Sequence, residues 1–240
     1  MSDTTEFEFV PLTDRGRRFR TDVVVRLDHA DVNGALRVDG IARFLQDVAT
    51  DDSNDADLES DDTWVVRRTN LRLVDGARWP RYLDRMALTT WCGGVGAAWA
   101  ERRTNIEVEG KIVIEAAGLW VPIDSTGHPV RLRQNFFDVY GEVARERRVS
   151  GRVTTPSIPD GAQRRPWPLR VADLDIIGHV NNAAVWQAVS DVALSPLSSV
   201  SVTHHASIEY DDDVTLVTVP GLLWLVADDL VMVSAQYSLV

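Results

Sequence analysis

The chain of 240 residues contains very little cysteine and lysine, and it has no long apolar run. Its single cysteine, Cys92, excludes an internal disulfide bond. Because Cys92 stands among apolar residues after Thr-Thr-Trp, we expect a buried strand thiol rather than a nucleophile. No segment approaches the roughly 18–20 apolar residues of a membrane helix, and residues 1–10 lack a signal-peptide pattern. The sequence therefore predicts a cytoplasmic protein without a membrane span.

An excess of basic charge and the motifs of several enzyme classes are also absent. The formal net charge is -11, which gives no reason to expect a nucleic-acid partner. There is no phosphate loop, dinucleotide fingerprint or Gly-x-Ser-x-Gly elbow. His204 and His205 are adjacent, but no cysteines or second histidine pair at ligand spacing accompany them. We therefore expect neither a metal nor another cofactor.

An internal repeat organises the sequence. Arg26, Asp31 and Gly34 match Arg170, Asp175 and Gly178 at a constant offset of 144 residues, and Asp47-Val48-Ala49 matches Asp191-Val192-Ala193 at the same offset. A chance match of this many positions without a gap is improbable. The chain is therefore predicted to contain two copies of one structural unit.

Each copy has the pattern of an α+β unit, in which a strand, an Asp-x-x-Gly turn and a helix precede several antiparallel strands. The helix stripe runs from Val38 to Ala49 in the first copy and from Val185 to Val192 in the second, where Asn181 and Asn182 are placed to cap it. The later strands are expected at 64–74, 82–92, 97–108 and 112–123, and at 201–210, 214–219, 222–227 and 230–237.

These patterns predict a first domain at 1–140, a linker at 141–168 and a second domain at 169–240. Residues 51–62 are strongly acidic, so we expect a solvated loop there. The linker is basic, and it is either simply solvated or the segment that binds an anionic carrier. Its arginines are Arg145, Arg147, Arg148, Arg152, Arg164 and Arg165.

The candidate for chemistry is the turn of the second copy, where Asp175 precedes Gly178 and His179. A carboxylate there can act as general base on water or as nucleophile, and a histidine can position substrate or water. A helix start offers N–H groups to an oxyanion, and glycine allows close approach of the backbone. The same residues also suit an ordinary turn. For Asp173 we expect a solvated side chain.

The run from Asp173 to Asn182, followed by a helix and by Ile208-Glu209-Tyr210, resembles the hot-dog thioesterases. The two-copy arrangement resembles the acyl-acyl carrier protein thioesterases, and Leu45-Gln46-Asp47 and the run from Trp120 to Asp124 add to the likeness. The resemblance implies two tandem hot-dog domains, each a central helix wrapped by a curved antiparallel sheet. It also implies hydrolysis of fatty acyl thioesters of acyl carrier protein to free fatty acid, within fatty acid biosynthesis.

The resemblance also assigns roles in the second domain. It implies catalytic roles for Asp175, His179 and Asp213, and substrate contacts by Gly178, Val180, Asn181 and Asn182. The first copy has Ala35 where the second has His179, so one site per chain is expected. The first domain would then supply the fatty-acyl tunnel.

Two departures from the plant-type pattern concern the same site. Ile177 stands where those enzymes have asparagine, and Asp213-Val214 stands where they have Glu-Cys. Val214 cannot act as a nucleophile, which leaves Asp175 as general base or nucleophile. Whether Asn181 or Asn182 takes over the missing amide stays open.

Several alternatives remain at this point. The substrate could be an acyl-coenzyme A instead of an acyl carrier protein, and the arginines of the linker or of Arg15 to Arg18 would bind either. A hot-dog hydratase is a less fitting enzyme class, because its usual spacing of Asp and His differs. A non-catalytic acyl-binding protein would explain Ile177 and Val214 equally well. Both a monomer and a homodimer are compatible with a tandem pair.

Overall fold

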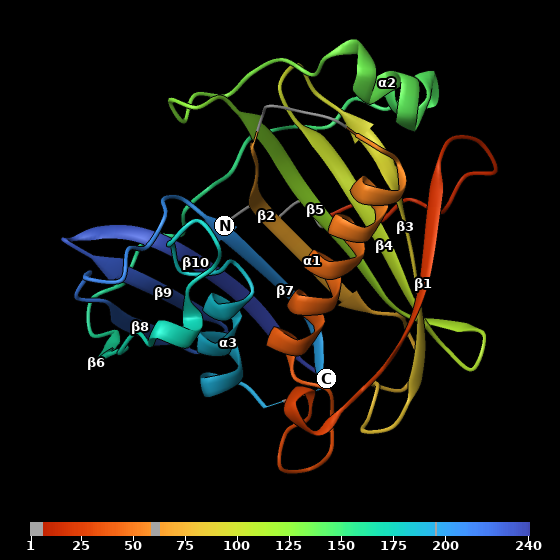
Figure 1. The fold of residues 1–240 in the computed structure, drawn as a ribbon. Coiled ribbons are helices and arrows are strands. Elements are labelled where there is room, and N and C mark those ends of the chain that lie inside the picture. The colour runs from red at the N-terminus through yellow and green to blue at the C-terminus, as the bar shows by residue number, and fades with distance from the viewer. Residues whose placement is uncertain (1–6, 59–62, 195) are drawn as a thin grey trace.

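The structure, a computed structural model, describes residues 7–58, 63–194 and 196–240, and these form one ten-stranded sheet (Figure 1). The strand order is β1-β3-β4-β5-β2-β7-β10-β9-β8-β6, so each half of the chain supplies five consecutive positions. The first half contributes β1 (Arg18–Val24), β2 (Thr63–Leu73), β3 (Arg85–Val95), β4 (Ala100–Val108) and β5 (Lys111–Ile123). The second half contributes β6 (Gln163–Pro166), β7 (Leu197–His204), β8 (Thr215–Val219), β9 (Leu222–Ala227) and β10 (Leu230–Leu239).

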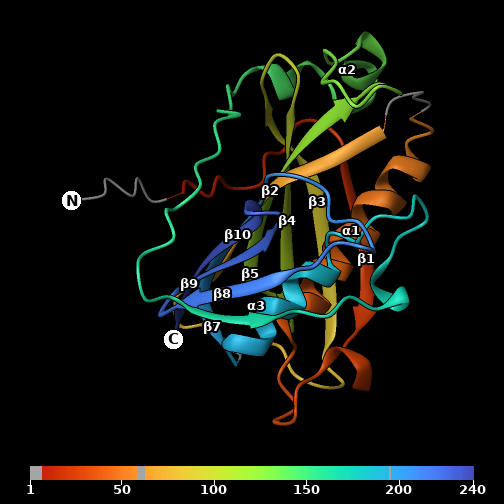
Figure 2. The ribbon, with the colours of Figure 1, turned by 90° about the vertical axis from the view of Figure 1, so that its left-hand side faces the viewer.

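The two halves are joined edge to edge. β2 pairs with β7 in antiparallel register, with Thr69 opposite Val202 and Leu71 opposite Val200. All neighbouring strands in the sheet are antiparallel, and the sheet curves from one half into the other (Figure 2). This junction satisfies the backbone groups of two strands that would otherwise be exposed edges.

The helices of the two halves differ greatly in length. Helix α1 (Val38–Asp55) has 18 residues and crosses the strands of the first half, whereas α3 (Gln187–Val192) has six and continues the 3-10 turn η4 (Ala184–Trp186). α2 (Gln134–Tyr140) packs at the end of the first half, and the remaining 3-10 turns are η1 (Leu27–His29), η2 (Glu142–Arg145) and η3 (Val171–Asp173).

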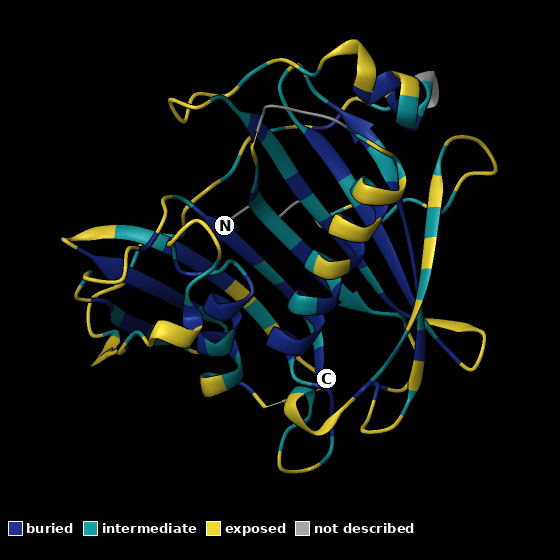
Figure 3. Cartoon of the chain, in the orientation of Figure 1, coloured by how far each residue is buried: buried dark blue, intermediate teal, exposed yellow. Residues whose placement is uncertain are grey.

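The core follows from the apolar stripe of α1. Val38, Ile41 and Val48 are almost fully buried and face the sheet, while the opposite side of the helix is exposed (Figure 3). The same hydrophobic cluster continues through Ala188 and Val189 of α3, so one core spans both halves. A hydroxyl of Ser190 in α3 donates to Oδ1 of the buried Asp39 in α1 at 3.0 Å, which fixes the two helices against each other.

One expectation about element bounds was wrong. The strand expected at 201–210 is β7, which begins at Leu197 and ends at His204. It ends there because His205 and Ala206 both donate their backbone N–H to the carbonyl of Met232 instead of continuing the ladder. The helix of the second half covers the predicted stripe from Val185 to Val192, and its first turn is 3-10 rather than α-helical.

The prediction of a solvated loop at 51–62 was also wrong for the first part of this segment. Helix α1 continues to Asp55, and Asp52 is only 1% exposed. Its carboxylate binds Arg17 Nε at 2.8 Å and Arg102 Nη1 at 2.6 Å, and it accepts a hydrogen bond from the Tyr140 hydroxyl at 2.9 Å. These partners come from distant parts of the chain, so local charge density gave no sign of them. Residues 59–62 of this segment lie outside the described residues.

The end of the predicted linker takes part in the sheet. Residues Gln163–Pro166 form β6, which pairs with β8, and the next residue, Trp167, is buried. Trp167 donates its backbone N–H to the carbonyl of Val214 at 2.8 Å. Within the described part of the chain, no helix combines the length and the apolar character that crossing a bilayer demands.

Candidate active site

The repeated Asp-x-x-Gly sequence forms a tight turn in the second half. Asp175 donates its N–H to the carbonyl of His179 at 2.8 Å, and Gly178 donates to the carbonyl of Asp175 at 3.1 Å. Oδ1 of Asp175 also accepts the N–H of Ile177 at 3.0 Å. Gly178 has φ of +89°, a left-handed conformation that side chains disfavour. The turn therefore fixes the orientation of the Asp175 carboxylate and requires a glycine.

Contacts on either side hold this turn against the loop after β7 and against η3. Val180 donates to the carbonyl of Ile208 at 2.9 Å, and Asn181 donates to the carbonyl of Asp173 at 2.8 Å. Asp173 is 3% exposed and its carboxylate binds the Arg170 guanidinium at 2.7 Å, so the expectation of a solvated side chain was wrong. The buried Asp173 closes the loop that carries Asp175.

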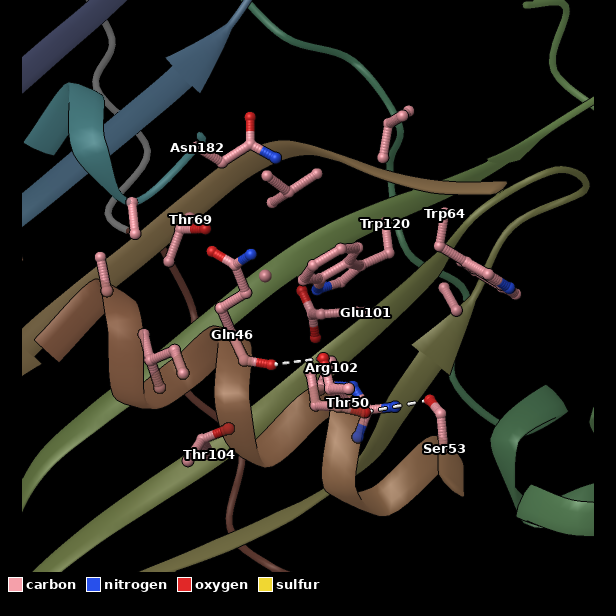
Figure 4. A pocket seen from close by; sticks show the side chains of 18 of the residues that line it. Gln46, Thr50, Ser53, Trp64, Thr69, Glu101, Arg102, Thr104, Trp120 and Asn182 are labelled. Carbon is pink, nitrogen blue, oxygen red and sulfur yellow. Dashed lines mark hydrogen bonds between the residues drawn. The ribbon is translucent and has the colours of Figure 1, made fainter. Parts of the chain in front are cut away.

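A cavity of about 380 Å³ lies beside this loop, between α1 and the face of the sheet that α1 covers (Figure 4). Its size falls in the range of small-molecule sites. The second half contributes Asp175, Ile177, Asn182, Ala183, Trp186 and His204 to its wall. The first half contributes most of the wall, including Leu45, Gln46 and Ala49 of α1, Thr69 of β2, Cys92 of β3, Thr104 of β4, Trp120 of β5, and Phe136 and Tyr140 of α2.

The structure separates the residues to which the resemblance assigns roles. Asp175 and Asn182 line the cavity, together with Ile177. The side chain of Asn181 is engaged elsewhere, since its Oδ1 accepts the N–H of Ala183 at 2.8 Å and caps the following helical turn. The residues outside the cavity wall are Gly178, which is exposed; Val180, which is buried; Asp213, which is exposed; and His179.

His179 has a partner that the sequence did not indicate. Its Nε2 lies 3.4 Å from Oε1 of Glu209, and both side chains are partly exposed. Glu209 is in the loop after β7, close to Ile208, whose carbonyl holds Val180. The loop that follows β7 thus holds both the backbone and the imidazole of the Asp175 turn.

The cysteine of the cavity wall is a poor nucleophile. Cys92 lies in β3, and burial raises the pKa of its thiol to about 11. At neutral pH the thiolate is therefore scarce. Asp175 remains as a carboxylate that borders the cavity, with one oxygen held by Ile177 and the other available to a bound molecule. No cluster of His, Cys, Asp or Glu suited to a metal ion occurs in residues 7–58, 63–194 or 196–240.

Sequence reasoning missed most of the cavity wall. Arg102 and Tyr140 line it and bind the buried Asp52, and burial raises the pKa of the Tyr140 hydroxyl. His204 also lines it, is 7% exposed, and has its pKa lowered to about 4 by burial. A polar residue in the apolar alternation of β7 was the available signal for His204. No local signal marks Arg102.

Comparison with known proteins supports the same arrangement. The model of the acyl-ACP thioesterase N-terminal domain matches residues 16–140, and that of the acyl-ACP thioesterase C-terminal domain matches residues 159–228. An uncharacterised protein of Mycobacterium tuberculosis is 29% identical over 184 residues, which cover 75% of this chain and 71% of that protein. The chloroplastic oleoyl-acyl carrier protein thioesterase of Coriandrum sativum is 24% identical over 242 residues, covering 87% of this chain and 64% of that protein.

Solved structures confirm the predicted hot-dog architecture. The 12:0-ACP thioesterase from Umbellularia californica superposes with a TM-score of 0.77 at 18% identity, covering 95% of this chain and 98% of that one. An acyl-ACP thioesterase from Bacteroides thetaiotaomicron gives 0.75 at 18% identity, with 92% and 97% coverage. At these identities the likeness concerns the fold, and the roles of individual residues depend on the geometry of this chain.

Proposed function

The chain belongs to the acyl-ACP thioesterase family and is a thioester hydrolase, and we propose that it releases fatty acids from acyl carrier protein by means of Asp175. The observation that supports this most is the position of Asp175. Its carboxylate is fixed by a rigid turn and borders a cavity of about 380 Å³ that the long helix α1 covers. In this proposal the acyl chain occupies the cavity and the thioester carbonyl lies next to Asp175.

Two routes use the same carboxylate. In the first, Asp175 takes a proton from a water molecule, which attacks the carbonyl carbon. In the second, Asp175 attacks the carbonyl itself and water opens the resulting mixed anhydride. In both, the C–S bond breaks and the departing sulfur takes a proton to give the free thiol carrier. Single turnover in ¹⁸O-labelled water identifies the second route if label enters Asp175, which happens when water opens the anhydride at the aspartyl carbon.

We assign the amide missing at Ile177 to Asn182. The side chain of Asn181 is used to cap the helical turn, whereas that of Asn182 lines the cavity and has no hydrogen-bond partner among the described residues. An amide N–H directed at the thioester oxygen would stabilise the negative charge that develops there. Asn182→Leu should therefore lower kcat, whereas Asn181→Leu should chiefly lower stability.

His179 would act from the rim of the site, with Glu209 as its positioning partner. The 3.4 Å separation of Nε2 and Oε1 orients the imidazole, and a histidine at this place can hold water or supply a proton to the departing sulfur. Asp213 and Glu209 are both exposed and outside the cavity wall, but Glu209 lies 3.4 Å from His179, so Glu209 is the better candidate for the carboxylate that supports this histidine.

Fewer arginines are available to contact the carrier than the sequence suggests. Arg17 binds Asp52 and Asp55, and Arg147 binds Glu101, so these arginines serve the fold. Arg148, Arg152 and Arg164 are exposed, and no carboxylate of the described residues lies at ion-pair distance from them. These three would meet the acidic surface of acyl carrier protein.

The test measures release of free thiol from acyl carrier protein and coenzyme A thioesters of matched chain lengths. We expect kcat/KM to be higher for the carrier-protein substrates, and charge reversal at Arg148, Arg152 and Arg164 to lower it for them alone. Equal rates on both carriers would contradict the carrier assignment. Tight binding of acyl thioesters without any turnover would contradict hydrolysis and favour an acyl-binding protein.

A further inference from the structure

The cavity contains more unused hydrogen-bonding groups than an alkyl chain requires. Several of its polar side chains are already paired: the hydroxyl of Ser53 donates to the carbonyl of Ala49, and that of Thr104 donates to Thr90. Among the amide, hydroxyl and imidazole side chains of the wall that are at least partly buried, four have no hydrogen-bond partner within the described residues. These are Gln46, Thr69, Asn182 and His204.

These four groups come from both halves and meet at one end of the cavity. Thr69 of β2 faces Val202 of β7, and His204 lies two residues further along the same face of β7, a diagonal neighbour. Figure 4 shows the amide of Gln46 directed toward Thr69, with Asn182 reaching into the same region from its loop. Asn182 belongs to the loop that carries Asp175, so this is the end next to the reacting carboxylate.

The charged residues of the wall other than Asp175 are already paired with neighbouring residues and offer no such unused capacity. Arg102 is matched by Asp52 at 2.6 Å and Tyr140 at 2.9 Å. The carboxylate of Glu101 is matched by Arg103 and by Arg147, at 2.7 and 2.5 Å. Apart from the Asp175 carboxylate, the wall therefore presents neutral polar groups to a ligand, and an anionic substituent would find no free counter-charge there.

An unsubstituted acyl chain would displace water from these neutral groups without replacing its hydrogen bonds. A buried polar group that is left unpaired weakens binding. Nε2 of His204 is already sealed from solvent without a partner. Asn182 is assigned to the thioester oxygen, and the sealed Nε2 of His204 does not face a ligand, which leaves Gln46 and Thr69 at the end of the cavity that also contains Asp175.

We propose that the preferred substrates are acyl thioesters that carry a hydroxyl or oxo oxygen at C3, and that Gln46 and Thr69 bind this oxygen. The proposal rests on the proposed hydrolysis at Asp175 and specifies its substrate class. A C3 oxygen lies three bonds from the carbonyl carbon, which would place it at the polar end of the cavity. The threonine hydroxyl and glutamine amide can each donate or accept, so they suit either form of the oxygen.

The experiment compares kcat/KM for acyl, 3-hydroxyacyl and 3-oxoacyl carrier-protein thioesters of one chain length. We expect at least one oxygenated substrate to exceed the plain one by about tenfold, equivalent to one hydrogen bond of about 1.4 kcal/mol. Thr69→Val and Gln46→Leu should bring that ratio close to one, and Thr69→Ser should retain it. Thr104→Val is the matched control, because Thr104 lines the same cavity with its hydroxyl already bound, so its ratio should stay at the wild-type value.

Thermal unfolding of each variant confirms that the ratios are measured on folded protein. Equal turnover of all three substrates by the wild type would overturn this proposal alone and leave thioester hydrolysis standing. A preference that survives both Thr69→Val and Gln46→Leu would also overturn it, since the named residues would not be its source. Absence of turnover on every thioester would overturn the proposed function, and this proposal with it.

Discussion

The turns at Asp31 and at Asp175 have the same backbone hydrogen bonds but different surroundings. Asp31 donates to the carbonyl of Ala35 at 2.8 Å as Asp175 does to His179, and η1 and η3 precede the two turns at the same spacing. Oδ1 of Asp31 accepts two backbone N–H groups, and its Oδ2 is buried without a partner in the described structure. Only Asp175 borders the cavity. The repeated sequence thus specifies a turn, and its neighbours decide whether the turn meets a ligand.

The helices that follow the turns explain the difference. The 18 residues of α1 extend far beyond the first turn and cover the cavity. The six residues of α3 are too few to do this, so the second turn lies at the edge of the cavity. The first half therefore builds the binding chamber and the second half brings the reacting carboxylate to it. Four predictions test this division of roles, and they are ordered from the largest expected effect on stability or activity to the smallest.

The largest expected effect concerns buried carboxylates in the two halves. Asp52 is 1% exposed and has three polar partners, so Asp52→Asn should lower the free energy of unfolding by about 4 kcal/mol. Asp173 binds an arginine that is largely exposed, so Asp173→Asn should cost about 1 kcal/mol. Urea unfolding measures both. Equal losses would contradict a first half held together by its buried charges.

The second effect concerns His204. Burial lowers the pKa of this histidine from 6.5 to about 4. Between these values the unfolded chain binds the proton and the folded chain does not, so stability falls as pH drops from 6.5 to 4. The loss approaches 3 kcal/mol at about 1.4 kcal/mol per pH unit. His204→Phe should flatten this part of the pH dependence of unfolding, measured against the wild type. Parallel curves would show that this histidine is not buried in neutral form.

A third effect separates the histidine pairs of the two halves. Glu209→Gln removes the charge 3.4 Å from His179 and should lower kcat about tenfold with little change in KM. The control is Asp28→Asn, which removes the carboxylate 3.7 Å from His29 in the first half and should leave kcat unchanged. Steady-state kinetics on one thioester suffices. An unchanged kcat in Glu209→Gln would remove the positioning role of Glu209.

The smallest effect uses the two turn glycines. Gly34 and Gly178 have φ of +75° and +89°, and no backbone atom would contact an added Cβ at either position within 4 Å. Both alanine variants should lose about 1 kcal/mol of stability because of the left-handed conformation. Only Gly178→Ala should also lower kcat, because it shifts the Asp175 carboxylate. A matching loss of kcat in Gly34→Ala would mean that the first turn serves catalysis too.

Much of the fold could be predicted because its signals are local. The period of apolar residues marked α1, the 144-residue repeat marked the second turn, and glycines marked the hairpins between the strands of the first half. The bounds of β7 could not be predicted, since they depend on contacts such as that of Met232 with His205. Tertiary contacts of this kind leave no period in the sequence.

The candidate site was predictable only where one short motif carries it. Asp175 and Asn182 belong to a single run, so the sequence pointed to them directly. Gln46, Thr69 and His204 come from three elements and share only their place in the folded cavity. The burial of Asp52 against Arg17 and Arg102 likewise joins residues that are far apart in the chain.

The most direct test of the central claim compares Asp175→Asn with Asp31→Asn. Each substitution keeps the oxygen that accepts the backbone N–H groups of its turn and removes only the negative charge. The measurement is the rate of thiol release from an acyl carrier protein thioester under single-turnover conditions. We predict a loss of about a thousandfold for Asp175→Asn and less than about threefold for Asp31→Asn. Equal rates for the two variants, or a larger loss for Asp31→Asn, would contradict the assignment of the chemistry to the second half.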